Sequence, residues 1–214
     1  MRLDHVSYVA SHDQISDTVN RIGSQIGTAF IDGGIHPRFG TRNFTAPLLN
    51  GQYVEIVCPI EHPATDNSPF GTAVRKKAGQ GGGWLSWIIA TNDINEYETL
   101  LKRQSVVGER KKPDGKILTW KQIGVLSNIE NAANPFFVEW ISKEHPSLDG
   151  EPSARISKIS ILANSTNSNL LDMTIKRIID NGIDFIILNS KGAEYDQGIT
   201  KVDFLVNGKI ISIT

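Results

Sequence analysis

Two short stretches of this sequence place a glutamate among apolar residues. Residues 53–63 read YVEIVCPIEHP and residues 137–146 read FVEWISKEHP, so each joins an aromatic-Val-Glu segment to Glu-His-Pro. A carboxylate in a buried strand costs free energy unless it is paired or binds a metal. Glu55 and Glu139 are therefore candidates for metal binding or acid–base chemistry.

Histidines near these strands supply the second type of side chain that such chemistry uses. In LDHVSYVA, residues 3–10, alternation along a strand places His5 on one face and Val6 and Tyr8 on the other. If the apolar face packs on a helix, His5 points toward the open side of the sheet. One imidazole with two carboxylates suits Zn, Fe, Mn, Co or Ni, and it lacks the thiolates of a structural zinc site. His36, on or beside the next strand, would add a second imidazole.

The repeated phrase predicts a repeated unit of one strand, one helix and three strands. The first copy has a strand at 3–10, a helix at 13–26 and a hairpin over 40–57 that turns at Asn50-Gly51. The second copy repeats this order within residues 83–141.

A third, shorter copy occupies residues 154–214, with a helix at 169–182 and a final hairpin that turns at Asn207-Gly208. Alignment of its strands on the first copy sets Lys158 opposite His5 and Ser212 opposite Glu55. This copy keeps the pattern of the fold without either polar side chain. That difference favours a functional role for His5 and Glu55 over a structural one.

The order of elements resembles the glyoxalase-like domains of the vicinal oxygen chelate superfamily, which shares the glyoxalase, extradiol dioxygenase and bleomycin-resistance fold. LDHVSYV, GGIHPRFGTRN and NGQYVEIV in the first copy, and GGGWLSWIIATND in the second, carry the resemblance. It implies an α+β fold in which tandem βαβββ modules form a curled, mixed-sheet cup, followed by a third, compact βαβββ-like module. We expect module boundaries at 1–78, 79–150 and 151–214.

The resemblance also implies a divalent metal inside the cup, held by the first and fourth strands of each module. By position, the implied ligands are His5, Glu55 and Glu139, with Glu139 as third ligand or general base. The remaining ligand position falls at Leu85 or Ser86, and neither side chain is a usual ligand. Three protein ligands with open water positions are therefore expected.

Further residues are candidates for substrate binding, and each has an alternative structural interpretation. Arg42 and Asn43 would bind an anionic group, or else form a charged strand end in water. Trp87 would line the cup against an organic substrate, or else belong to the core. The polar candidates have alternatives too: Glu55 would pair with an arginine such as Arg42, and Glu139 with Arg110 or Lys121.

These expectations favour a metal-dependent enzyme that acts on a small oxygenated organic molecule by lyase, isomerase or dioxygenase-type chemistry. The alternative is a metal-free protein of the same fold that binds or sequesters a small molecule. A purely structural module is a third possibility, because an unpaired third unit could complete a cup in a second chain. That unit predicts a homodimer.

The composition of the chain limits the classes of partner that it is expected to bind. The chain has 214 residues with 22 Lys and Arg against 23 Asp and Glu, a balance that argues against nucleic acid as a partner. No segment approaches the roughly 18 consecutive apolar residues of a membrane span. The single cysteine, Cys58, excludes an internal disulfide and suits a reducing compartment. We expect a cytoplasmic protein whose partner is a small molecule, without nucleic acid or membrane.

Overall fold

The computed structural model describes residues 1–164, 169–178, 182–189 and 197–214. The first unit consists of β1 (Arg2–Val9), α1 (Ile15–Ile26), β2 (Ile31–His36), β3 (Thr41–Leu48) and β4 (Gln52–Pro59). The predicted turn between β3 and β4 is present at Asn50 and Gly51, which have φ angles of 64° and 70°. β1 pairs in parallel with β4, and β3 lies between β4 and β2.

The second unit repeats this arrangement with β5 (Gly83–Ala90), α4 (Asn95–Leu101), β6 (Val106–Lys111), β7 (Ile117–Ile123) and β8 (Phe136–Trp140). β5 pairs in parallel with β8, as β1 does with β4. Three short helices were not expected: α2 (Pro63–Asn67), α3 (Pro69–Gly79) and α5 (Val125–Glu130). Ser68 begins α3 by accepting a hydrogen bond from the backbone N–H of Gly71, and proline follows it at the first helical position.

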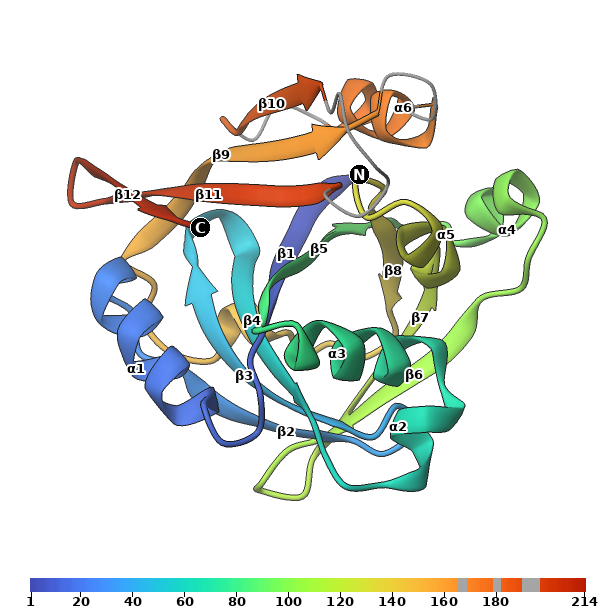
Figure 1. Cartoon of the computed structure of the whole chain (residues 1–214), viewed down its shortest axis with the longest axis horizontal. Helices are drawn as coiled ribbons and strands as arrows, with labels where there is room; N and C mark the ends of the chain where they lie inside the picture. Colours follow the sequence, from blue (N-terminus) through green and yellow to red (C-terminus); the bar gives the residue numbers. More distant parts are fainter. Residues whose placement is uncertain (165–168, 179–181, 190–196) are drawn as a thin grey trace.

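The two units join along both of their edges and close one barrel. Its strand order is β1-β4-β3-β2-β6-β7-β8-β5, with β1 antiparallel to β5 and β2 antiparallel to β6. In Figure 1, α3 lies across the opening of this barrel. The curled mixed sheet expected from the sequence is therefore confirmed, and its closure leaves the barrel without a free edge.

The third unit forms a separate sheet from β9 (Ala154–Ala163), β10 (Asp184–Asn189), β11 (Gly198–Val206) and β12 (Lys209–Ile213), with α6 (Asn169–Arg177). Its element order is βαβββ as expected, and Asn207 and Gly208 form the predicted turn with positive φ. Its strand order is β10-β9-β11-β12, so the first strand does not pair with the last. Residues 179–181 of the expected helix lie outside the described residues.

This strand order corrects the predicted equivalence of Ser212 with Glu55. Ser212 lies on the edge strand β12 and donates a 2.6 Å hydrogen bond to Asp203 on β11. Asp203, and not Ser212, is in register with Lys158. The hairpin was recognised correctly, but alignment of short strands cannot tell which strand will lie beside β9.

The two faces of the barrel strands bury different sets of side chains. Val6, Val54 and Ile56 face outward and share one hydrophobic core with α1 and with the second sheet, whose Phe204 belongs to the same core. Val57 and Val138 belong to a second apolar cluster on the inner face. The prediction that Val6 packs outside while His5 faces the interior is confirmed. None of the helices in the described ranges is long and apolar enough to span a membrane.

Candidate functional site

A narrow pocket lies in the barrel interior, and apart from the space at its open mouth its cavity has a volume of about 30 Å³. Its polar lining comes mainly from the first unit: His5, His36, Asn43, Tyr53 and Glu55, joined by Arg110 and Gln122 from the second. Its apolar lining consists of Phe39, Phe70, Trp120, Phe136, Val138 and Trp140. The repeated units therefore contribute unequally to the site, because most of the polar groups come from one of them.

A bulge in β1 brings Asp4 and His5 together. Leu3 pairs with Ile89 and His5 pairs with Ile88, so Asp4 has no partner residue on β5. An extra residue of this kind interrupts the alternation of side chains along a strand. Asp4 consequently reaches the same polar network as His5, although simple alternation would put the two on opposite faces.

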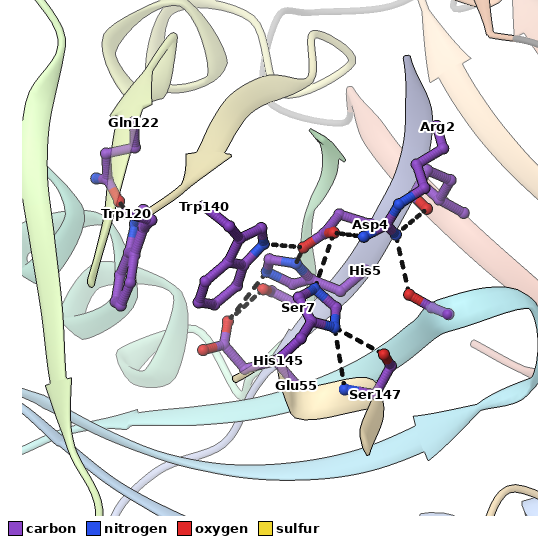
Figure 2. A network of polar contacts seen from close by, with 12 residues as sticks. Arg2, Asp4, His5, Ser7, Glu55, Trp120, Gln122, Trp140, His145 and Ser147 are labelled. Carbon is purple, nitrogen blue, oxygen red and sulfur yellow. Dashed lines mark hydrogen bonds and ion pairs between the residues drawn. The ribbon is translucent and has the colours of Figure 1, made fainter. Parts of the chain in front are cut away.

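Asp4 is fully buried and accepts hydrogen bonds or ion pairs from four side chains (Figure 2). The donors are Arg2 at 2.9 Å, His5 Nδ1 at 3.0 Å, His145 Nε2 at 3.1 Å and Trp140 Nε1 at 3.2 Å. Burial alone would raise the pKa of Asp4, but the hydrogen bonds from the two histidines and the attraction of their positive charge together outweigh it and hold the pKa far below its ordinary value. Asp4 is therefore ionised at neutral pH.

The ionised Asp4 fixes the tautomer and the orientation of His5. A carboxylate can only accept, so His5 Nδ1 carries the hydrogen and Nε2 is left to face the pocket. The His5 ring stacks on Tyr53 with a centroid distance of 4.2 Å. His5 Nε2 lies 3.9 Å from Glu55 Oε2, which puts the two groups on either side of a small polar space.

Glu55 is the second buried carboxylate of the site, with 5% of its surface exposed. Ser7 Oγ donates to Oε2 at 2.5 Å and Asn43 Nδ2 donates to Oε1 at 2.7 Å. Burial would raise the pKa of Glu55, but the nearby His5 and His36 and these two hydrogen bonds together lower it. Glu55 therefore remains an anion with both oxygens engaged.

His36 lies in the pocket wall as a neutral side chain. It is 3% exposed, and its Nδ1 is 2.9 Å from Thr41 Oγ1. Burial, more than any other influence, lowers the pKa of His36 to about 4, and the positive charge of Arg110 acts in the same direction. At neutral pH this imidazole contributes polarity without charge.

Glu139 lies outside the pocket, contrary to its expected role as ligand or base. Its side chain is 27% exposed and its Oε2 is 3.9 Å from Lys121 Nζ, the pairing that the sequence left as an alternative. The inward positions of β8 are Phe136, Val138 and Trp140.

The repeated phrase is shifted by one residue between its two copies. His62 follows Glu55 by seven positions and His145 follows Glu139 by six, yet both histidines cap a helical turn, α2 and η2 (Pro146–Leu148) respectively. Alignment on the capping histidines sets Val138 opposite Glu55. A one-residue shift moves a strand side chain to the other face, so Glu139 points away.

Of the three residues expected to bind substrate, one lines the pocket and two lie outside it. Asn43 lines the pocket, whereas Arg42 is an outward neighbour that pairs with Asp32 and lies over the Phe44 ring. Trp87 is fully buried outside the barrel interior, where its Nε1 donates to the Ala133 carbonyl. Arg42 and Trp87 therefore do not contact the pocket.

These positions do not fit a metal site with three protein ligands. His5 and Glu55 approach each other, but Val138 stands opposite Glu55 in the second unit, Leu85 or Ser86 stands opposite His5, and both oxygens of Glu55 already accept hydrogen bonds. Within the part of the chain that the structure describes, no three His, Cys, Asp or Glu side chains group closely enough to hold a metal. Ser86, one of the two options for the fourth ligand position, is buried beside Ser7.

Several residues of the network were missed because no periodic pattern marks them. Asp4 depends on a bulge, which sequence alternation does not reveal. Arg110 stands in a run of charged residues before a turn, ERKKPDG, which is typical of a solvated hairpin. His145 appears in the sequence only as part of the repeated Glu-His-Pro phrase; it caps η2 and also donates to Asp4.

Comparisons with known proteins agree with this fold. A family model described as a glyoxalase-like domain matches residues 3–171. A hypothetical protein from Staphylococcus aureus superposes with a TM-score of 0.64 at 17% identity, covering 100% of this chain and 98% of that one. Methylmalonyl-CoA epimerase from Mycobacterium tuberculosis gives a TM-score of 0.42 at 11% identity, covering 65% and 86%. No curated protein sequence matches.

Proposed function

This chain belongs to the glyoxalase-like domain family, and from that premise we propose that its barrel pocket binds a small oxygenated organic molecule and exchanges a proton with it. The observation that carries the proposal is the Asp4–His5 pair, in which a buried carboxylate holds an imidazole with Nε2 facing the pocket. Such a pair is suited to general acid–base catalysis.

The proposed reaction is proton transfer at a carbon next to a carbonyl group. His5 Nε2 accepts the proton, the electron pair of the C–H bond forms an enolate, and the proton returns from the imidazolium to complete an exchange or isomerisation. Asp4 stabilises the imidazolium through Nδ1–H, while Glu55 lies 3.9 Å from Nε2. Both carboxylates have a lowered pKa, which keeps them charged while His5 carries the proton.

The apolar lining supports a substrate with a hydrocarbon portion. Aromatic side chains from α3, β7 and β8 form this part of the wall, among them Phe70, Trp120 and Phe136. A mostly apolar cleft with a few convergent polar groups is the usual form of a small-molecule site. It also keeps water from the enolate.

A metal-dependent form of this chemistry would require Zn, Fe, Mn, Ni or Co at His5 and Glu55 with a third protein ligand. The described residues supply no third ligand there, so we assign no step to a metal. Elemental analysis of protein prepared without a metal-affinity tag, wild type beside Glu55→Gln, tests this choice. One equivalent of a transition metal that is lost in the variant would restore the metal-dependent lyase, isomerase or dioxygenase interpretation.

Hydrogen–deuterium exchange tests the proposed proton transfer. Ketones, aldehydes and 2-oxo acids are incubated with the protein in D₂O, and loss of the proton signal next to the carbonyl is followed by NMR. We expect the wild type to exceed the buffer rate by about 100-fold or more, the usual scale of general acid–base catalysis. His5→Gln should fall to the buffer rate, and His12→Gln, at an exposed histidine, should match the wild type.

The alternative, a protein that binds a small molecule without reaction, uses the same pocket. Compounds that bind at the pocket but never exchange faster than in buffer would favour it. The homodimer and the cytoplasmic location stay predictions. The exposed apolar side chains Ile186, Ile187 and Leu188 on the edge strand β10 support association of two chains, and light scattering of the purified protein measures it.

A further inference from the structure

Arg110 on β6 is a buried cation without an anionic partner in the barrel interior. It is 2% exposed and lines the pocket. Neither its Nε nor its Nη2 has a hydrogen-bond partner. Among the residues that the structure describes, no carboxylate lies within 4.0 Å of its guanidinium.

The two buried carboxylates of the site are already engaged by other side chains. Both oxygens of Glu55 accept hydrogen bonds from Ser7 and Asn43, and Asp4 is surrounded by Arg2, Trp140 and two histidines. Burial of an unpaired guanidinium is costly, because the charge loses its water without gaining a partner. A group that enters the pocket with a negative charge would remove this cost.

We propose that Arg110 binds the carboxylate of a small organic acid, which names the substrate class of the pocket and in that respect rests on the proposed function. Nε and Nη2 form one edge of the planar guanidinium, and two parallel N–H donors on one edge match the two oxygens of a carboxylate. This edge is the part of Arg110 that has no partner in the protein.

Glycine at position 33 makes room for this arrangement. A Cβ at Gly33 would lie 2.2 Å from Asn43 Oδ1 and 2.9 Å from Arg110 Nη1. A side chain on β2 would therefore displace both groups. The free space keeps Arg110 and Asn43 side by side on the polar half of the pocket.

The rest of the acid lies against apolar walls. Phe136 and Trp120 line the same pocket as Arg110. Beyond Phe39 and Phe70, which both cavities share, a second cavity of about 310 Å³ opens toward solvent. The ligand is therefore an acid with an aromatic or aliphatic body rather than an inorganic anion.

Thermal unfolding and calorimetric titration test the site with three carboxylates of increasing length: acetate, phenylacetate and 4-phenylbutyrate. The neutral phenylacetamide and inorganic phosphate are the comparison ligands. We expect at least one carboxylate to raise the Tm of the wild type, and phenylacetamide to bind at least about tenfold more weakly than phenylacetate, the usual loss for a charged hydrogen bond.

Variants at two arginines assign the effect to one guanidinium. Arg110→Met should lose the carboxylate effect, and its Tm without ligand should equal or exceed that of the wild type because an unpaired charge is removed. Arg110→Lys keeps the charge without the two-donor edge and should bind about tenfold more weakly. Arg42→Met, an outward arginine on β3, should bind like the wild type.

Failure of this inference is distinct from failure of the proposed proton transfer. If none of the three carboxylates stabilises the wild type, or if phosphate or the amide binds as well as phenylacetate, Arg110 is not a carboxylate site. If carboxylates bind through Arg110 in both the wild type and His5→Gln but no compound exchanges deuterium, the proton-transfer proposal fails and the carboxylate site stands. If compounds exchange deuterium but carboxylates bind no better than the amide or phosphate, the proton-transfer proposal stands and the carboxylate site fails.

Discussion

Asp4 and His5 are adjacent in the chain, yet their side chains meet, with Asp4 Oδ2 3.0 Å from His5 Nδ1. The contact requires the bulge in β1 opposite β5, which removes Asp4 from the regular alternation. Asp4 also accepts hydrogen bonds from His145 and Trp140 of the second unit. A carboxylate from one repeat is thus held in place by donors from the other.

Asp4→Asn should therefore change both catalysis and stability. An asparagine amide can also donate, so it no longer fixes the His5 tautomer. We expect deuterium exchange to fall to about the buffer rate, because loss of the aspartate partner of a catalytic histidine can cost about 10⁴-fold in rate. Unfolding in urea should show a loss of about 3 kcal/mol, the scale for removal of one member of a buried charged pair. Unchanged exchange in a folded variant would remove Asp4 from the mechanism.

The same carboxylate should govern stability in acid. Because the pKa of Asp4 is lower in the folded state than the ordinary value of 3.8, its contribution to stability is full above about pH 4 and decreases as the pH falls further. Urea unfolding measured from pH 5 down to pH 2 should show a steep loss in the wild type. Asp4→Asn should have a shallower slope, and an equal slope in both proteins would contradict this role.

His36 should produce a separate pH dependence. Its pKa is about 4 in the folded state against an ordinary value of 6.5, so between these values the unfolded chain binds more protons. Stability should fall as the pH decreases from 6.5 to 4, by up to about 1.4 kcal/mol per pH unit. NMR titration of the ring measures the pKa directly, and His36→Gln should lose this part of the slope.

Glu139 and Glu55 provide a matched pair of substitutions in the two repeats. Glu139→Gln removes the charge of a partly exposed partner of Lys121 and should change the unfolding free energy by less than about 1 kcal/mol, with deuterium exchange unaffected. Glu55→Gln places an amide where Ser7 and Asn43 both donate, and should cost about 1–3 kcal/mol and reduce exchange. If the two substitutions change stability and deuterium exchange equally, Glu139 belongs to the functional site.

Gly108 tests the packing of the aromatic wall. A Cβ at this position on β6 would lie 2.4 Å from Trp120 Cε2 on the neighbouring strand, so alanine must displace the indole. Gly108→Ala should destabilise the protein by about 1–3 kcal/mol, the usual range for overpacking. It should also weaken ligand binding in the pocket. If Gly108→Ala keeps the stability and ligand affinity of the wild type, the position of Trp120 matters neither for packing nor for ligand binding.

Local patterns predicted much of the fold. Alternation placed His5 and Glu55 on the inner face, and the Asn-Gly pairs at residues 50 and 207 marked hairpin turns that are present. Features that depend on pairing between distant strands were not predictable in this way. The order of the third sheet, the bulge at Asp4 and the shift at Glu139 all follow from which strands become neighbours.

The residues of the site also divide into those that local patterns indicate and those that depend on pairing between distant strands. Residue type and strand face together indicated His5 and Glu55, whereas His36 and Asn43 were named from residue type alone; all four line the pocket. Arg110 was missed because a single arginine among charged neighbours has no signal for burial, and its burial arises from barrel closure beside β2. Glu139 was predicted as the third metal ligand because the repeated phrase matches in sequence. In the structure, however, Glu55 and Glu139 lie on opposite faces of their strands.

The two seams of the barrel differ in strength. β1 and β5 share seven registered pairs, whereas β2 and β6 share the single pair Ile35–Lys111, all within described residues. Arg110 and His36 stand directly beside that weaker seam. Its amide protons should exchange before those of β1, so brief separation of β2 from β6 gives solvent and small molecules a second route into the interior in addition to the pocket mouth.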